Sequence, residues 1–553
     1  MWFLFFAFLF SIQSIPRIWT DSPYTDETWE TTTGFYYWFK GEVIAPLNQP
    51  PLAEALEAFP LLFMDLKIEP GIWNNSENRA YSLHYVSNLQ KLNEMIIWPR
   101  LIAFIFVLGT GFLLFLWARS EENVVYFFAL LLWAFEPNLL AFSIVSKADA
   151  IFSFFCVASL MIFLKGQKEY KNKWDFLAGV LVGMAATSKL TALCLLPIYL
   201  TIDLWEVWKK PGFLPNLFRR WLVGIAGFMA AVFLIFLPGT LMAKEHWFPF
   251  TYFYQRVAEA IRIPNELNIL HMPYFFCGKS YSQEQLWQFP VILALKSTTP
   301  FIILLLVAIF AMISRKVRVP FWILFFPLAW ILLLHVSPSI NLRYILPAYP
   351  TLILIASKGA GWLWELGEKS ELRVFRKVVV FLGIWTVIST AVNFPHYAGY
   401  FNDFIVSEKK WKLLDYHYID LNQDLKRLGK VAGERHWNRV KLVYAGQDDP
   451  FYYGLPIWEP WTLRDLQGPQ AGYTYVVQAS FLMAGSSESD KIFPIRHCWA
   501  ARVKPTGMVG ETWFYYEMPG VPEKDHSLEL PSTPYLVYQN APYRKPMGSI
   551  EKN

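Results

Sequence analysis

Two adjacent acids, Asp26 and Glu27, follow closely on the apolar run that opens the chain at residues 2–19. An Asp at the centre of a membrane helix costs about 2.5–3.5 kcal/mol, so these carboxylates belong at the membrane surface, in a cavity or in water. Charges at a helix end are commonly solvated. A carboxylate held at a fixed depth could instead act as a general base, which must reach the proton that it removes.

The residues after the two acids restrict their loop. Aromatic residues come first, followed by the run Asn48, Gln49, Pro50 and Pro51. The two prolines fix an extended chain. Residues 52–66 have the amphipathic pattern of a helix lying on a membrane surface. Because such a loop can hold a carboxylate at one depth, we predict that Asp26 and Glu27 carry chemistry.

A second polar segment, residues 146–149, lies between two apolar stretches and ends in Asp149. An Asp at such a position often caps the helix that follows. The alternation of spans described below places Asp149 at the same depth and on the same side as Asp26. Two carboxylates on neighbouring loops could share the activation of an acceptor and the steering of a leaving phosphate.

Two cationic positions could face that phosphate. Lys189 lies within the apolar stretch 175–206, where it either extends toward the interface as a structural lysine or faces an anion. Arg343 precedes Tyr344 at the start of another apolar stretch. An Arg there either anchors to lipid headgroups or binds a phosphate through two parallel hydrogen bonds.

The composition indicates that membrane helices position these residues. Of the 553 residues, 55% are apolar and 17% are charged, whereas soluble proteins carry about 25% charged residues. A membrane helix needs about 20 apolar residues. Suitable stretches are 2–19, 96–118, 123–144, 150–165, 221–241, 290–314, 320–336, 344–363 and 378–394. The first lacks the basic start and small-residue cleavage site of a signal peptide, which favours an anchor helix.

Basic segments set the predicted orientation. Lysines and arginines are concentrated in residues 165–173, 209–220, 314–319 and 369–377. Such segments remain in the cytoplasm. The stretch 175–206 lies between two of them, so it must cross an even number of times, as a hairpin that turns at residues 187–189. Alternation then gives about eleven transmembrane helices and places the acidic loops outside.

The chain changes character after residue 394. Helical periodicity appears in residues 420–431, and strand-like pieces are 440–446, 473–480 and 512–518. We predict a polytopic α-helical membrane domain over residues 1–394, whose first outer loop is 20–95. An outward-facing, mixed α/β domain follows over 395–520, and residues 521–553 form an extended or disordered tail.

Several short motifs, in their order along the chain, resemble those of a known family. They are Asp26-Glu27, Asn48 to Leu52, Ser146 to Asp149 running into Phe154-Phe155, Thr187 to Thr191, Tyr274 to Gly278, Lys296 to Pro300, Asn341 to Pro350, Phe394 to Tyr397, Tyr400 to Asn402 and Leu421 to Leu425. The chain resembles the polyprenyl-phosphate-dependent glycosyltransferases of the GT-C superfamily, in the bacterial branch related to protein O-mannosyltransferases and the lipid A aminoarabinose transferase. The resemblance extends over roughly residues 1–520.

The resemblance implies transfer of one sugar from a polyprenyl-phosphate donor to a hydroxyl acceptor on the non-cytoplasmic face. Asp26 would be the catalytic carboxylate, Glu27 its companion and Asp149 the second acid. Lys189, Arg343 and Tyr344 would bind the donor phosphate, and the run Asn48, Gln49, Pro50 and Pro51 would position the loop. The acceptor would be a protein, a glycolipid or a polysaccharide.

One position departs from the family pattern. Many relatives have a histidine before the two prolines, where this chain has Gln49. If that histidine binds a metal or the donor in relatives, Gln49 does so poorly or differently. A divalent metal is therefore in doubt, and we predict neither a metal ligand nor a cofactor.

Two other functions fit a protein with many helices and membrane acids. A transporter or flippase for lipid-linked sugars commonly shows internal repeats, and none is visible here. A non-catalytic subunit of an envelope assembly machine would retain the fold, and Gln49 keeps this alternative open. The net charge of +5 is scattered, which argues against a nucleic-acid partner. The predicted location is the inner (plasma) membrane, with the C-terminal domain outside the cytoplasm.

Overall fold

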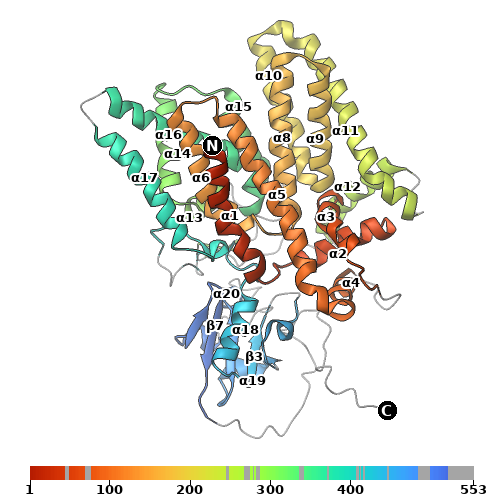
Figure 1. Cartoon of the computed structure of the whole chain (residues 1–553), viewed down its shortest axis with the longest axis vertical. Coiled ribbons are helices and arrows are strands. Elements are labelled where there is room, and N and C mark those ends of the chain that lie inside the picture. The colour runs from red at the N-terminus through yellow and green to blue at the C-terminus, as the bar shows by residue number, and fades with distance from the viewer. Residues whose placement is uncertain are drawn as a thin grey trace. The chain divides into compact units, whose positions relative to one another are not determined.

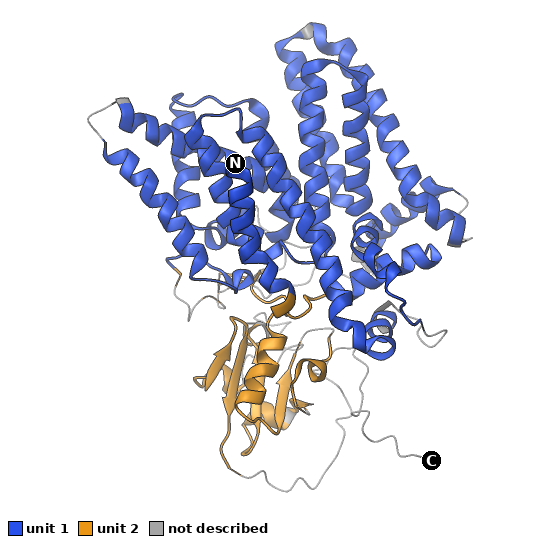
Figure 2. Ribbon diagram, viewed as in Figure 1, with its two compact units in different colours: residues 1–18, 27–270, 284–404 blue, residues 19–26, 271–283, 405–553 orange. Residues whose placement is uncertain are grey.

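The computed structural model divides into two compact units (Figure 2). Unit 1 comprises residues 1–18, 27–270 and 284–404, and unit 2 comprises residues 19–26, 271–283 and 405–553. The structure describes residues 1–43, 49–68, 76–243, 248–266, 274–277, 279–281, 287–334, 342–369, 373–405, 410, 413–414, 418–444, 448–456, 458–483 and 498–520. The predicted tail over 521–553 lies outside the described residues.

Unit 1 is helical (Figure 1). Its described helices are α1 (Trp2–Thr20), α2 (Glu27–Lys40), α3 (Leu52–Ala58), α4 (Ser76–Tyr81), α5 (Leu92–Ala118), α6 (Asn123–Phe135), α7 (Pro137–Phe142), α8 (Ala148–Glu169), α9 (Asn172–Ser188), α10 (Leu195–Lys209), α11 (Leu214–Ala243), α12 (Pro249–Glu266), α13 (Gln288–Lys296), α14 (Thr299–Ile313), α15 (Phe321–Leu333), α16 (Tyr349–Lys369) and α17 (Val374–Ala391). Short helical turns include η1 (Phe59–Phe63), η2 (Ser82–Ser87), η4 (Leu190–Cys194) and η8 (Leu342–Ala348).

Six segments of the described chain are long and apolar enough to cross a membrane. They are Trp2–Thr20, Leu89–Ala118, Ala148–Glu169, Leu190–Lys209, Leu214–Met242 and Val374–Ala391, and the shorter helices α6, α14 and α15 are also apolar. The chain is therefore a polytopic helical membrane protein, as predicted. The number of about eleven crossings remains a prediction.

Two predicted spans are each divided into two helices. The stretch 123–144 forms α6 and α7, and the stretch 290–314 forms α13 and α14. Each second helix has a proline in its first turn, Pro137 in α7 and Pro300 in α14. Proline suits the first turn of a helix, and it disfavours the helical conformation of the residue before it. At residues 187–189, where a hairpin turn is predicted, α9 ends at Ser188 and Lys189 is extended.

The predicted basic loop 209–220 is partly wrong, because α11 already begins at Leu214. Arg220 therefore lies inside a helix and is buried. Its Nε is 2.9 Å from Asp175 Oδ1, and its Nη1 is 2.5 Å from Asp203 Oδ1. A buried guanidinium needs partners of this kind, and these acids lie on α9 and α10. The ion network thus joins three helices of unit 1.

Helix α3 is buried, which corrects the prediction of a membrane-surface helix over residues 52–66. Glu54 and Glu57 are 1% and 0% exposed. Helix α2 approaches α3 closely at Gly34, where an added Cβ would lie 1.8 Å from the carbonyl oxygen of Glu54. The polar positions of α3 therefore face protein, and the exposed apolar side chains belong to η1, including Phe63 at 75%.

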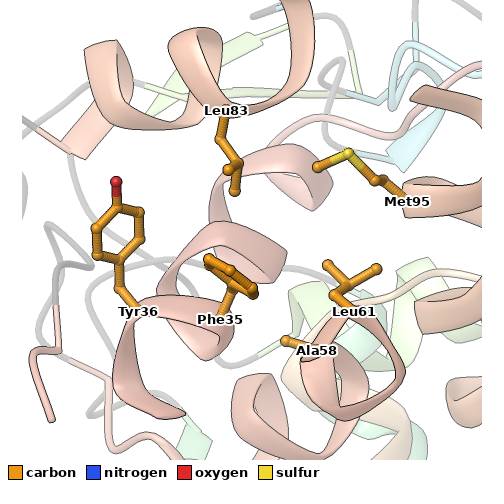
Figure 3. Close-up of a cluster of buried hydrophobic side chains, with 6 residues drawn as sticks. All are labelled: Phe35, Tyr36, Ala58, Leu61, Leu83 and Met95. Carbon is orange, nitrogen blue, oxygen red and sulfur yellow. The ribbon is translucent and has the colours of Figure 1, made fainter. Parts of the chain in front are cut away.

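An apolar cluster holds α2, α3 and η1 to the apolar helix α5 (Figure 3). It consists of Phe35 and Tyr36 of α2, Ala58 of α3, Leu61 of η1, Leu83 of η2 and Met95 of α5. Burying apolar surface stabilises such contacts by about 25 cal/mol per Å². The cluster therefore fixes α2 and α3 relative to α5, although they belong to a long loop.

Unit 2 contains a five-stranded sheet in the order β4-β3-β5-β7-β6. The strands are β3 (Val440–Val443), β4 (Trp458–Pro460), β5 (Thr474–Gln478), β6 (Gly507–Val509) and β7 (Trp513–Glu517), and the helices are α18 (Leu425–Glu434), α19 (Leu463–Gln467) and α20 (Ala479–Met483). β3 is parallel to β4 and β5, whereas β7 is antiparallel to β5 and β6. A separate antiparallel pair joins β1 (Tyr274–Phe276) and β2 (Lys279–Tyr281). The mixed α/β character predicted for this region is confirmed.

Candidate active site

A cluster of charged side chains lies where α8, α9 and η8 meet in unit 1. Asp149 lies in the first turn of α8 and is buried. Lys189 Nζ is 2.6 Å from Asp149 Oδ1, and Arg343 Nε is 3.5 Å from Asp149 Oδ2. The structure thus brings together one carboxylate and two cations that are far apart in the sequence.

Tyr344 completes this cluster. Lys189 Nζ lies 4.1 Å from the centre of the Tyr344 ring, a distance at which the ring face attracts a cation. Trp330 Nε1 of α15 donates to the backbone oxygen of Tyr344 at 2.8 Å, which fixes η8. Lys189 can reach these partners because it interrupts α9 in an extended conformation rather than continuing the helix. We call Asp149, Lys189, Arg343 and Tyr344 the charged cluster.

The charged cluster has a net positive charge. Two cations outweigh one carboxylate, which leaves about one positive charge among the four side chains. Lys189 and Asp149 are both buried, so water screens this charge less than it would at a surface. An anion of one negative charge, such as a phosphate diester, would be neutralised here.

Glu27 connects α2 to α5 and to the segment that precedes α8. Arg100 Nη2 of α5 lies 2.7 Å from Glu27 Oε2, and both side chains are buried. The backbone N–H of Ser146 donates to Glu27 Oε1 at 2.7 Å, and the N–H of Ala148 donates to Glu30 Oε2 at 3.3 Å. Helix α2 therefore holds the segment that leads into Asp149. The Glu27 carboxylate is occupied by these contacts, which suits a positioning role.

Asp26 belongs to unit 2. Its φ of 75° lies in the left-handed region, where residues other than glycine are uncommon. Such strain costs on the order of 1–3 kcal/mol and is concentrated at functional sites. The side chain is partly exposed, so it is accessible in a way that Glu27 is not.

The residues just before Asp26 are clamped by the start of α18, within unit 2. The N–H of Ser22 donates to the oxygen of Gln423 at 3.0 Å, and that of Thr25 donates to the oxygen of Leu421 at 2.9 Å. Arg427 Nη2 bonds Asp21 Oδ1 at 2.5 Å. The motif Leu421 to Leu425, noted in the sequence only for its resemblance, thus holds the segment that carries Asp26.

The loop-positioning residues are only partly described. Pro51 is buried and immediately precedes α3. Gln49 has a buried Oε1 without a hydrogen-bond partner. Asn48 lies outside the described residues. Within the part of the chain that the structure describes, no group of three or more His, Cys, Asp or Glu side chains is arranged to hold a metal ion.

Sequence reasoning missed two arginines. Arg100 lies inside the predicted span 96–118, and an ionised residue within a membrane segment is by itself a reason to look for a partner. Arg427 lies in an amphipathic helical segment with other basic residues, and nothing in the sequence distinguishes it. Arg100 holds Glu27 directly, whereas Arg427 holds Asp21, in the segment that precedes Asp26.

The fold is that of a polytopic helical membrane protein, and the charged cluster lies where α8, α9 and η8 meet. Residues 89–236 match the family model described as dolichyl-phosphate-mannose-protein mannosyltransferase. The matched segment contains Arg100, Asp149 and Lys189. For this segment, the match supports the predicted resemblance to protein O-mannosyltransferases. A comparison with curated proteins found no match.

Some solved structures have a distant likeness to the chain. ArnT from Cupriavidus metallidurans in the apo state is 12% identical with a TM-score of 0.45, covering 93% of this chain and 97% of that one. The same protein bound to undecaprenyl phosphate is 11% identical with a TM-score of 0.43, covering 93% and 98%. The Archaeoglobus fulgidus oligosaccharyltransferase AglB, in complex with an inhibitory peptide and a dolichol-phosphate, is 12% identical with a TM-score of 0.44, covering 76% and 59%. At such low scores these likenesses carry no conclusion about the site.

Proposed function

We propose that the protein is a membrane glycosyltransferase that moves a single sugar from a polyprenyl-phosphate-linked donor to a hydroxyl acceptor. The observation that carries the proposal is the charged cluster, in which Asp149 holds two cations, Lys189 and Arg343. Asp149 and Lys189 lie in the segment that matches the mannosyltransferase family model. A sugar joined to a polyprenyl phosphate is a phosphate diester with one negative charge. Lys189 and Arg343 bind this phosphate, and Tyr344 and Asp149 hold the two cations in place.

The same cations stabilise the transition state. As the acceptor oxygen attacks the anomeric carbon, the bond between that carbon and the phosphate oxygen breaks. The phosphate leaves as a monoester and gains a second negative charge. Cations already placed at this position favour the more highly charged product, which is the usual electrostatic contribution to catalysis.

Asp26 accepts the proton of the attacking hydroxyl group. Its accessible carboxylate and strained backbone support this role. Glu27, the next residue, acts as a positioning residue through Arg100 and Ser146. Asp149 sets the positions of Lys189 and Arg343. No step requires a metal ion or a cofactor.

The lipid bilayer is a partner in this reaction. It contains the polyprenyl tail and holds the phosphate at the interface, which lowers the entropic cost of bringing donor and catalytic loop together. We place the protein in the inner (plasma) membrane, with the reaction and the C-terminal α/β domain outside the cytoplasm. We assign catalysis to the membrane domain, residues 1–394, and an accessory role to residues 395–520. The acceptor is a hydroxyl group of a protein, a glycolipid or a polysaccharide.

The test is transfer of a radiolabelled sugar by the purified full-length protein in lipid nanodiscs. Polyprenyl phosphates carrying different sugars are incubated with envelope extracts, and label is followed from lipid to acceptor. We expect transfer by the wild-type protein and a loss of about 10²–10⁴-fold in Asp26→Asn. Asp65→Asn is the matched control, because Asp65 is an exposed acid of the same loop that also has a positive φ.

Two results would contradict the proposal. Full turnover by Asp26→Asn would remove the assigned base. Movement of the intact sugar lipid across the membrane, without cleavage of its sugar–phosphate bond, would instead indicate a transporter. Folding of each variant is checked by its melting temperature.

A further inference from the structure

Two acids of α3 take no part in the chemistry described so far. Both side-chain oxygens of Glu57 and the Oε2 of Glu54 are buried without a hydrogen-bond partner. Buried polar atoms nearly always have one. The other buried acids nearby follow that rule, since Glu27 bonds Arg100 and Asp149 bonds Lys189. The carboxyl oxygens of Glu54 and Glu57 that lack a hydrogen-bond partner therefore point to a ligand.

The α3 acids lie on one side of a firmly held helix. Residues three apart on a helix are neighbours, so the carboxyl groups of Glu54 and Glu57 can contact one molecule together. Trp38 Nε1 of α2 donates to the oxygen of Ala55 at 2.7 Å, and Gly34 lets the two backbones touch. The apolar cluster in Figure 3 fixes the end of α3 at Ala58. Because α3 is held in this way, Glu54 and Glu57 cannot easily turn toward water.

The α3 acids also lie within electrostatic range of the charged cluster. Burial raises the pKa of Glu57 well above its usual value, and the carboxylates of Glu30, Glu54, Glu27 and Asp149 raise it further. Burial and the carboxylates of Glu30 and Asp149 raise the pKa of Glu54, whereas Lys189 lowers it. Of these neighbours, Glu27 is neutralised by Arg100 of α5, and Lys189 by Asp149. No ion pair joins either acid of α3 to a cation in the described part of the chain, and the raised pKa of each acid favours its neutral carboxyl form.

We propose that Glu54 and Glu57 bind the sugar of the donor, by exchanging hydrogen bonds with two adjacent hydroxyl groups of a neutral sugar. A neutral carboxyl group has one O–H donor and free acceptor positions. A sugar hydroxyl group also donates and accepts, so each matches the other. This inference rests on the proposed function and specifies the substrate: the charged cluster binds the phosphate, and the α3 pair binds the ring.

The experiment measures binding rather than turnover, so that it is independent of catalysis. Full-length protein in nanodiscs is titrated with bare polyprenyl phosphate and with polyprenyl phosphates carrying mannose, glucose, galactose or an amino sugar. The variants are Glu57→Gln, Glu57→Leu and Glu54→Gln. Glu94→Gln is the control, because Glu94 is an exposed acid of the same outer loop.

We expect the wild-type protein to bind one neutral sugar lipid more tightly than bare polyprenyl phosphate. Glu57→Leu should lose about 10–100-fold of that preference, because a buried hydrogen-bond partner is removed. Glu57→Gln and Glu54→Gln should keep it within a few-fold, since an amide also donates and accepts. Every variant should bind bare polyprenyl phosphate as the wild-type protein does.

Three results would overturn the inference. The first is a preference for the neutral sugar that survives in Glu57→Leu while the protein remains folded. The second is a wild-type preference for the amino sugar that disappears in Glu57→Gln, which would indicate ionised carboxylates that bind a cation. The third is the absence of any preference for a sugar lipid over the bare phosphate. Failure of the proposed function can be distinguished from failure of this inference, because it would appear as a lack of sugar transfer rather than as a change in binding preference.

Discussion

The side-chain nitrogen of Lys189 lies 2.6 Å from a carboxylate oxygen of Asp149, although forty residues separate them in the chain. The other oxygen of the same carboxylate faces Arg343 at 3.5 Å. Asp149 therefore holds two cations close together that would otherwise repel each other. Its own charge offsets one of theirs, which leaves a site suited to a single negative charge.

This arrangement predicts how charge changes alter the binding of bare polyprenyl phosphate. Lys189→Met leaves a site with no net charge, so affinity should fall about 10–100-fold, the value of a charge-assisted hydrogen bond. Asp149→Asn leaves two positive charges and should bind at least as tightly as the wild-type protein. The double variant regains one positive charge and should bind more tightly than Lys189→Met alone. Calorimetric titration at two salt concentrations checks this order, and equal affinities in all four proteins would refute it.

The ion pair between Glu27 and Arg100 predicts a different behaviour. Glu27→Gln leaves a buried guanidinium without its counter-charge, which costs about 3–5 kcal/mol, so the melting temperature should fall. Asp26→Asn should leave it nearly unchanged. For a positioning residue, we expect Glu27→Gln to lower kcat while KM for the donor stays within a few-fold. A large rise in KM with unchanged kcat would show that Glu27 binds the donor instead.

Much of the membrane domain could be predicted from the sequence, because the features that define it are local. Apolar length and basic segments marked most helices, and the chain breaks at Lys189, one of the residues predicted for the hairpin turn. The divisions before Pro137 and Pro300 were missed because each long apolar stretch was taken as one span, although Glu136 and residues 296–299 interrupt the apolar pattern. The burial of Glu54 and Glu57 could not be predicted, since their amphipathic pattern is the same for a helix at a membrane surface. A buried helix and a helix at a membrane surface differ only in which residues pack against them in the folded protein.

The candidate site shows the same limit. The residue types needed for phosphate binding were visible at Lys189 and Arg343, but their meeting at Asp149 depends on how α8, α9 and η8 pack. The division of roles between Asp26 and Glu27 was not visible. It depends on Arg100 and on Ser146, both remote in the sequence, and on a contact between residues 21–25 and the start of α18.

That contact leads to a prediction for Arg427. Its guanidinium bonds Asp21 and also lies 2.5 Å from Asp424 Oδ1. Arg427→Met removes both bonds and loosens the segment before Asp26, so we expect transfer to fall about tenfold or more while affinity for polyprenyl phosphate is unchanged. Arg435→Met is the control, because Arg435 is an exposed residue that follows the same helix. Unchanged transfer in Arg427→Met would show that the clamp does not position Asp26.

The buried His84 predicts a pH dependence of stability. Burial lowers its pKa from 6.5 to about 4, and its Nδ1 lies 3.1 Å from the oxygen of Ala80, which fits a neutral ring. Because the folded pKa lies below the unfolded value, this contribution is complete above pH 6.5 and is lost as the pH falls toward 4. At about 1.4 kcal/mol per pH unit, the loss approaches about 3 kcal/mol. Melting temperatures of the wild-type protein should therefore fall more steeply on acidification than those of His84→Phe, and parallel curves would contradict this.

The buried ion network at Arg220 predicts that removal of this arginine lowers the stability of the protein but leaves donor binding intact. Arg220→Met leaves Asp175 and Asp203 buried without their main cation, which costs about 3–5 kcal/mol. The neighbouring Arg219 is partly exposed and lies 3.4 Å from Asp175, so Arg219→Met should cost no more than about 1 kcal/mol. Thermal unfolding in nanodiscs measures the difference, and donor affinity at low temperature should be normal in both variants. If both variants melt at the same temperature, the network around Arg220 does not hold α9, α10 and α11 together, and the helices rely on apolar packing alone.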